Sequence, residues 1–179
     1  MRLLILLLIF SSAANAVTLS SLLARDDQLI VADKLNGKII IVNGTVSQAP
    51  ALYGRTIADS TGDINSFPIT PAGEFHIRKA YSTHLKTDVV AFLEGDTSLL
   101  AIHPVWLGSP KQNRLQRLAT ETGNDNRITN GCINVPRNFF YDIINKLKDR
   151  TRLVILPEHE TLVIDFAAVT DLKRDEVLQ

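Results

Sequence analysis

The chain has 179 residues, of which 45% are hydrophobic and 21% are charged, so its composition is that of an ordinary globular domain and excludes wholesale disorder. Nineteen basic residues balance nineteen acidic residues, so the net charge gives no electrostatic reason to expect a nucleic-acid partner.

The first sixteen residues are typical of a secretion signal. Met1-Arg2 is a short basic start, residues 3–10 form an unbroken apolar run, and Ala14-Asn15-Ala16 is a small-x-small cleavage sequence. As a helix the apolar run spans about 12 Å, well short of the roughly 30 Å hydrocarbon core of a bilayer. We therefore expect no stable membrane anchor after cleavage, with an uncleaved N-terminal helix as the alternative.

This interpretation divides the chain into a signal peptide, residues 1–16, and a single domain, residues 17–179, whose core covers about residues 28–156. No internal repeat or linker interrupts the second part. Export predicts a location in the periplasm or the cell envelope. The sequence gives no indication of the oligomeric state.

Alternating and β-branched runs predict strands along most of the domain. Asn36-Gly37 predicts the turn of one hairpin, and Glu94-Gly95-Asp96 predicts the turn of a second. The polar segment 59–65 predicts a loop, and two prolines exclude regular pairing over residues 67–73. The expected strands cover residues 28–33, 37–43, 52–58, 74–81, 88–93, 98–103, 128–135 and 151–156.

Helical spacing occurs in two places. Residues 110–119 predict a helix with Leu115 and Leu118 on one face and the basic residues, Arg114 among them, on other faces. Pro136 predicts the start of a second helix with an apolar face extending to Leu147. We expect residues 161–179 to be a loosely attached end. The sequence therefore predicts a mainly β fold with a few helices.

Cys132 is the only cysteine, although an oxidising compartment normally pairs thiols. An inert buried thiol, an intermolecular disulfide and a reactive thiol are all consistent with this count. Gly131 removes a side chain beside Cys132, so a substrate carbonyl can approach the sulfur and backbone N–H groups can form an oxyanion hole. The local sequence therefore favours a cysteine nucleophile.

A nucleophilic cysteine needs a base or a cationic partner, because a free thiol titrates near 8.5. His103 is the natural candidate, since it ends a predicted strand directly before Pro104. A structural histidine is the alternative. The other histidines favour surface or hydrogen-bonded roles, and the four share no metal-ligand spacing, so no metal site is expected. These other histidines are His76, His84 and His159.

The segment around Cys132 resembles the L,D-transpeptidase, or YkuD-type, catalytic domains. Their signature is a histidine followed downstream by Ser/Thr-His-Gly-Cys-hydrophobic-Asn, and Thr129, Gly131, Cys132, Ile133 and Asn134 match it. The segment from Thr70 to Phe75 is similar to the Thr-Pro-x-Gly-x-Phe segment of these domains, and residues 101–103 are similar to their base-bearing strand. The resemblance covers about residues 28–156.

The chain departs from this signature in two ways. Asn130 stands where the commoner signature has histidine, and asparagine forms hydrogen bonds but does not titrate. The spacer over residues 104–128 is longer than usual in the family, so the predicted helix at 110–119 resembles an insertion. This insertion is expected to form a lid or one wall of a substrate cleft, with Trp106 either lining the cleft or packed in the core.

The resemblance implies an L,D-transpeptidase-like β-sandwich or mixed sheet with one helix after the cysteine strand. It also implies a two-step acyl transfer on peptidoglycan stem peptides without a cofactor. Cys132 would be the nucleophile and His103 the proton donor and acceptor, while Gly131 and the Cys132 N–H would hold the oxyanion. Thr129, Asn130 and Asn134 would orient the site. Arg127 would either bind a stem carboxylate or be solvated.

Two alternatives remain at this point. The same thioester could be given to water, which would make the protein an L,D-carboxypeptidase or an enzyme that attaches or detaches wall proteins. A different class of protein, a non-catalytic periplasmic wall-binding module, is also consistent with the sequence, and Asn130 is the feature that favours it.

Overall fold

The computed structural model describes residues 15–23, 28–58, 68–96 and 98–165. The expected loop at 59–65 and most of the expected signal peptide lie outside these residues. The expected cleavage point, between Ala16 and Val17, lies inside the first strand, β1 (Asn15–Thr18).

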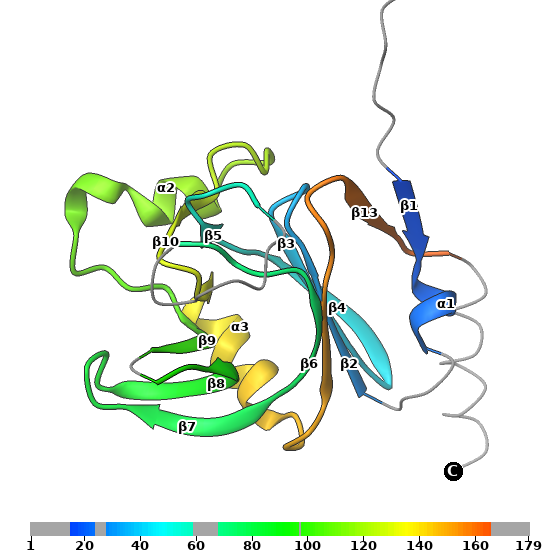
Figure 1. Cartoon of the computed structure of the whole chain (residues 1–179), viewed down its shortest axis with the longest axis horizontal. Coiled ribbons are helices and arrows are strands. Elements are labelled where there is room, and N and C mark those ends of the chain that lie inside the picture. Colours follow the sequence, from blue (N-terminus) through cyan, green and yellow to red (C-terminus); the bar gives the residue numbers. More distant parts are fainter. Residues whose placement is uncertain (1–14, 24–27, 59–67, 97, 166–179) are drawn as a thin grey trace, which may run out of the picture.

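Within the described part, two larger β-sheets stack face to face, and two small two-stranded sheets flank them (Figure 1). The five-stranded sheet has the order β4 (Thr45–Pro50), β3 (Lys38–Asn43), β2 (Gln28–Asp33), β12 (Arg152–Ile155) and β6 (Gly73–His76). The four-stranded sheet has the order β11 (Ile133–Val135), β9 (Leu99–Pro104), β8 (Thr87–Glu94) and β7 (Arg78–Ser82). The small sheets pair β5 (Tyr53–Gly54) with β10 (Arg127–Thr129), and β1 with β13 (Glu160–Val163).

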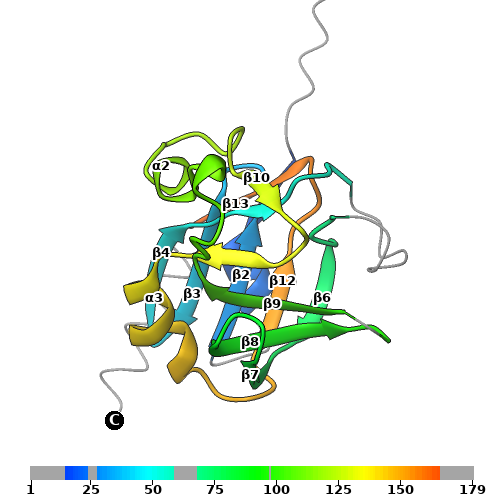
Figure 2. The same ribbon diagram turned by 90° about the vertical axis from the view of Figure 1, so that its left-hand side faces the viewer.

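Short helical segments lie outside the two larger sheets (Figure 2). The helical elements are α1 (Leu19–Leu23), η1 (Pro110–Gln112), α2 (Arg114–Leu118), α3 (Arg137–Asp142) and η2 (Ile144–Lys146). Helix α3 directly follows β11, the strand after Cys132. The mainly β fold, and the helix after the cysteine strand, confirm the prediction from the sequence.

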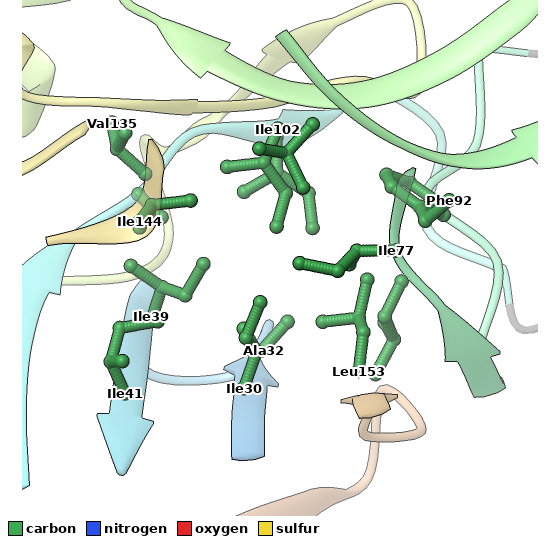
Figure 3. Close-up of a cluster of buried hydrophobic side chains, with 14 of the residues drawn as sticks. Ile30, Ala32, Ile39, Ile41, Ile77, Phe92, Ile102, Val135, Ile144 and Leu153 are labelled. Carbon is green, nitrogen blue, oxygen red and sulfur yellow. The ribbon is translucent and has the colours of Figure 1, made fainter. Parts of the chain in front are cut away.

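The main hydrophobic core lies between the two larger sheets (Figure 3). Ile30 and Leu153 reach it from the five-stranded sheet, Ile102 and Val135 from the four-stranded sheet, and Ile144 closes one end. Because alternate residues of a strand point to opposite faces, the inward position of Ile133 and Val135 directs Asn134, which lies between them, to the other face of β11. The core thereby fixes which side of the sheet carries Asn134.

The outer face of the five-stranded sheet is also apolar, which explains its nearly continuous hydrophobic strands. Leu29, Val31 and Ile40 form a second cluster on this face, and Leu19 of α1 and Leu162 of β13 pack on it. The described beginning of the tail is therefore a packed strand, parallel to β1, and the expectation of a loosely attached end is wrong for residues 161–163. Residues 166–179 lie outside the described part.

Most predicted strands form, but several boundaries differ. The 74–81 run breaks at Ile77, and the 128–135 run breaks at residues 130–132. Strand β4 was not predicted, because its sequence is polar and ends in proline, which the sheet edge tolerates. The predicted 110–119 helix breaks at Asn113, which has a φ of 50°.

The helical face predicted at 110–119 is wrong. Leu115 is 57% exposed, whereas Arg114 is only 9% exposed and points into the protein. The left-handed residue at 113 restarts the helix and shifts its phase, so the spacing of Leu115 and Leu118 does not define the buried side. Of these two leucines, only Leu118 is buried.

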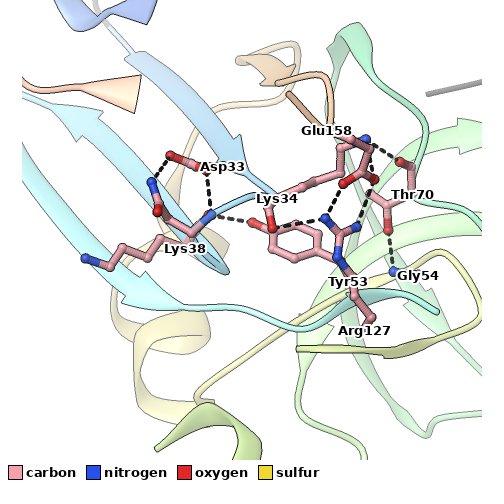
Figure 4. Close-up of polar contacts among 9 residues, drawn as sticks. Asp33, Lys34, Lys38, Tyr53, Gly54, Thr70, Arg127 and Glu158 are labelled. Carbon is pink, nitrogen blue, oxygen red and sulfur yellow. Dashed lines mark hydrogen bonds and ion pairs between the residues drawn. The ribbon is translucent and has the colours of Figure 1, made fainter. Parts of the chain in front are cut away.

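A buried ionic cluster ties the hairpin loop after β2 to the strands around the candidate site (Figure 4). Lys34 is fully buried and pairs with Glu158 at 3.1 Å, while Arg127 pairs with the same carboxylate and donates to the Lys34 carbonyl. The Arg127 guanidinium also lies 5.7 Å from the centre of the Tyr53 ring. Glu158 thus pairs with two cations.

Replacing Glu158 by glutamine should strongly destabilise the fold. Glu158→Gln removes the negative charge that pairs with Lys34 and Arg127, and breaking a buried pair in this way typically costs about 3 to 5 kcal/mol. Urea denaturation should show this loss. Glu94→Gln is the control, because the Glu94–Arg78 pair is exposed and should change the unfolding free energy by less than about 1 kcal/mol. Equal stability losses for the two variants would contradict the importance of the buried cluster.

Candidate active site

The turn that carries Cys132 depends on the glycine before it. Gly131 has a φ of 113°, and a Cβ added there would lie 2.5 Å from the Ile69 carbonyl oxygen. A side chain at this position would therefore clash with backbone and strain the turn. Thr129 closes the turn, because its hydroxyl accepts from the Gly131 N–H and donates to the Cys132 carbonyl.

A second threonine holds this turn in place from outside. Thr70 is buried; its hydroxyl donates to the Gly131 carbonyl at 2.9 Å and accepts from the Gly54 N–H at 2.8 Å. Its own carbonyl accepts from Lys34 Nζ at 3.2 Å. The Thr70 segment, noticed in the sequence only through resemblance, is thereby connected to the cysteine turn by direct hydrogen bonds.

Strands β9 and β11 bring His103 next to Asn134. The strands are parallel, with Asn134 opposite His103, and Cys132 lies just before β11, two residues before Asn134. His103 is only 4% exposed. Its Nε2 lies 3.1 Å from Asn134 Nδ2, and its Nδ1 lies 2.8 Å from the Pro104 carbonyl oxygen. Both ring nitrogens therefore have partners, and neither partner is Cys132.

Burial lowers the pKa of His103 to about 4, and the nearby Arg114 charge also lowers it. The hydrogen bond to Pro104 acts in the opposite direction but is the smaller effect. His103 is thus neutral at physiological pH. A neutral imidazole keeps one lone pair, which is what a proton acceptor requires.

Cys132 is half-buried against the main core, and its thiol donates weakly to the Leu99 carbonyl at 3.7 Å. Desolvation by the surrounding protein raises the pKa of the thiol. A hydrogen bond with the Ala101 backbone and the positive charge of Arg114 both lower this pKa, so they favour the thiolate. In this state of the protein the thiol form predominates at neutral pH.

Arg114 is the residue of this site that sequence reasoning missed. Its Nη1 donates to Asn134 Oδ1 at 2.5 Å, its Nε donates to Gln112 Oε1 at 2.7 Å, and its guanidinium lies 5.2 Å from the centre of the Trp106 ring. The sequence placed Arg114 on an outer helical face of the insertion. The insertion instead brings this arginine onto the strand that follows Cys132.

A pocket of about 440 Å³ opens beside His103. Trp106 lines it and is 37% exposed, and Tyr81 and Leu107 line it with larger exposed fractions. Cys132 is not among its lining residues. Trp106 therefore lies on a partly apolar surface next to His103, consistent with the cleft-lining alternative and not with full burial in the core.

The remaining predicted site residues are less central. Asn130 is exposed, and its side-chain oxygen accepts from Arg55 Nη1 at 2.6 Å. Arg127 is held in the buried ionic cluster, an arrangement that favours a structural role over binding of a stem carboxylate. The Gly131 N–H donates to Thr129, so within the described residues this N–H already has a partner.

Comparison with solved structures identifies the fold. L,D-transpeptidase 3 from Mycobacterium tuberculosis aligns with a TM-score of 0.51 at 13% identity, covering 73% of this chain and 61% of that one. The same enzyme with a faropenem-derived adduct aligns with a TM-score of 0.50 at 14% identity, covering 72% and 60% of the two chains. An L,D-transpeptidase from M. tuberculosis H37Rv gives a TM-score of 0.50 at 15% identity, covering 73% and 57%.

At these identities the likeness shows the fold, and the chain has the fold of the L,D-transpeptidases. It spans only 57% to 61% of the length of the aligned structures. No protein-family model and no curated protein sequence matches the chain.

Two searches of the described residues bear on other kinds of site. No helix in these residues has both the length and the apolar character needed to span a bilayer. The same residues contain no group of three or more His, Cys, Asp or Glu side chains that would suit a metal ion.

The buried, neutral state of His103 should make stability depend on pH. The folded-state pKa is about 4 and the ordinary value about 6.5, so between these pH values the unfolded chain binds more protons than the folded chain. His103 therefore favours folding fully above pH 6.5, and this contribution is lost as the pH falls toward 4. The expected loss at pH 4 is about 3 kcal/mol.

The measurement is the unfolding free energy of the wild type and of His103→Gln at pH 7 and pH 4. The wild type should lose about 3 kcal/mol more than the variant. His84→Gln, at an exposed position, should lose as much as the wild type. A parallel pH dependence for wild type and His103→Gln would contradict a buried neutral imidazole.

Proposed function

We propose that this protein is a cysteine acyltransferase of the L,D-transpeptidase type that acts on peptidoglycan stem peptides in the cell envelope. Cys132 is the nucleophile and His103 is the proton acceptor and donor. The observation that supports this most strongly is the pairing of β9 with β11, which sets His103 opposite Asn134, two residues after Cys132, within the L,D-transpeptidase fold. No cofactor takes part in the proposed chemistry.

In the first step the Cys132 sulfur attacks the carbonyl carbon of a stem-peptide amide. The S–C bond forms, the thiol proton passes to His103, and the C–N bond then breaks as the leaving amine takes that proton. The resemblance implies that D-alanine leaves. The N–H of Cys132 stabilises the oxyanion, because the N–H of Gly131 is already bonded to Thr129.

His103 can take this proton only through Nε2, since Nδ1 donates to the Pro104 carbonyl. Asn134 occupies Nε2 in the structure. The proposal therefore includes a small rearrangement on substrate binding. The Asn134 amide moves away from His103 Nε2, and the Cys132 thiol takes its place as the hydrogen-bond donor. Catalytic hydrogen bonds often tighten only when the substrate is bound.

In the second step an acceptor amine attacks the thioester carbonyl, gives a proton to His103, and releases the Cys132 thiolate. The product is a cross-linked stem. Water in place of the amine gives the carboxypeptidase outcome. Trp106 and the pocket beside His103 are the surface on which an acceptor would bind, because they adjoin the proton acceptor.

A non-catalytic wall-binding module is the second candidate function. The observation in its favour is the state of the thiol, whose pKa is raised by burial and which has no hydrogen bond with His103. Exposed apolar residues beside His103, such as Trp106 and Leu107, would then serve binding alone.

Replacement of the nucleophile tests the catalytic proposal. Incubation of purified muropeptides with the protein, followed by mass spectrometry, should give cross-linked dimers, with tripeptides if water competes. Cys132→Ala should lower turnover by at least about 10³-fold, because no other group forms the thioester. Thermal unfolding of Cys132→Ala should remain cooperative, because only a half-buried sulfur is removed.

Several results distinguish the alternatives. Tripeptides without dimers would show that the protein hydrolyses the thioester and does not transfer it to an amine. An active Cys132→Ala variant would exclude the cysteine mechanism. Binding of muropeptides without turnover by the wild type would support the wall-binding module.

A further inference from the structure

A donor-only group, the Arg114 guanidinium, and an acceptor-only group, the Pro104 carbonyl, lie on either side of the Asn134 and His103 side chains and fix their orientation. Arginine has no hydrogen-bond acceptor, so the Asn134 atom 2.5 Å from Arg114 Nη1 must be the amide oxygen. The other amide atom, 3.1 Å from His103 Nε2, must then be the NH₂ group. This assignment follows from the chemistry of arginine alone and not from the placement of the amide atoms.

The same logic continues through the imidazole ring. An NH₂ group only donates, so Nε2 of His103 must be the unprotonated nitrogen. A carbonyl oxygen only accepts, so Nδ1, 2.8 Å from the Pro104 carbonyl, must carry the proton. The hydrogen bonds therefore run in one direction from Arg114 through Asn134 and His103 to Pro104.

We infer that Arg114 is a positioning residue for the proposed reaction, which orients the Asn134 amide and thereby holds His103 in the Nδ1–H tautomer. This inference deepens the proposed function and rests on it for its catalytic meaning. The lone pair that must accept the thiol proton is kept on Nε2, which faces Asn134, two residues after Cys132. Without the arginine, the amide can turn its oxygen toward the ring, which would favour a proton on Nε2 and leave only the Pro104 carbonyl to hold the proton on Nδ1.

The residues around Arg114 hold its guanidinium in the position where it donates to Asn134. Its Nε is held by Gln112 Oε1, and its guanidinium lies over the Trp106 ring. Only 9% of the residue is exposed, so water does not readily replace the Asn134 contact. Asn134 itself is fully buried. The long spacer between β9 and β11 thus supplies a cation that the strands themselves do not contain.

The same charge acts on the nucleophile. Arg114 is the cation whose charge favours the Cys132 thiolate, and the commoner signature has an ionisable histidine at the position of the neutral Asn130. Charged groups that line the pocket on the other side of His103 are Lys86, Asp88 and Arg137. Arg114 differs from these three because it is linked to His103 through Asn134.

Nitrogen NMR of histidine-labelled protein tests the tautomer directly. Wild-type His103 should show a pyrrole-type Nδ1 and a pyridine-type Nε2 at pH 7. Arg114→Met should shift the population toward the Nε2–H tautomer or a mixture, whereas Arg114→Lys should restore much of the wild-type spectrum, because lysine also donates to Asn134 Oδ1. Arg117→Met is the matched control, because the Arg117 guanidinium donates its hydrogen bonds to the carbonyls of Gln112 and Asp125.

A second measurement follows the thiol. The rate of Cys132 alkylation by iodoacetamide, recorded against pH, should shift to higher pH in Arg114→Met, with a several-fold slower reaction at pH 7. Arg114→Lys and Arg117→Met should stay close to the wild type. Neither readout requires turnover of a stem peptide, so a protein without transferase activity still tests the role of Arg114.

An unchanged His103 tautomer together with an unchanged alkylation profile in a folded Arg114→Met variant would overturn the inference. If Arg114→Met does not fold, Asn134→Ser provides the test, because it removes the amide between the two residues. Asn134→Ser should alter the His103 spectrum while Arg114 remains in place. A wild-type tautomer in that variant would also overturn it.

Discussion

The hydroxyl of Thr70 is the contact on which the geometry around Cys132 depends most. It joins the Gly131 carbonyl to the Gly54 N–H, while the Thr70 carbonyl receives the buried Lys34 ammonium. The cysteine turn is therefore attached to the ionic cluster of Lys34, Glu158 and Arg127 by hydrogen bonds instead of side-chain packing. Gly131 completes this constraint, since its positive φ and its contact with the Ile69 carbonyl leave no space for a side chain.

The strands that were predicted well from the sequence are those whose buried residues form continuous apolar runs. The runs of β2 and β12 are apolar on both faces because the sheet is covered on both sides, and the Asn36-Gly37 turn joins β2 to β3 as expected. The proposed pairing of Cys132 with His103 came from the position of His103 at the end of a predicted strand and from the family resemblance. Strand β4 could not be predicted, because this edge strand has too few apolar residues to be recognised.

The part of the site that sequence reasoning missed depends on contacts between distant residues. Arg114 is buried because Asn134, twenty residues later, accepts its hydrogen bond. Helical periodicity over residues 110–119 carries no information about that acceptor. The left-handed conformation of Asn113 also changes the phase of the helix. Asparagine tolerates this conformation, but the hydrophobic periodicity of the segment does not indicate it. The exposed Leu115 is the visible result.

The parallel pairing of β9 with β11 has a consequence for how such chains are recognised. Hydrogen bonds between the strands set His103 opposite Asn134 whatever the number of residues between them. Loop closure becomes only slightly less favourable as a connection lengthens, by roughly 0.6 kcal/mol for each doubling. A long connection can therefore acquire residues that take part in the site without disturbing the strands. Strand register, and not the count of residues separating a histidine from a cysteine, is then the feature by which distant relatives of this kind can be compared.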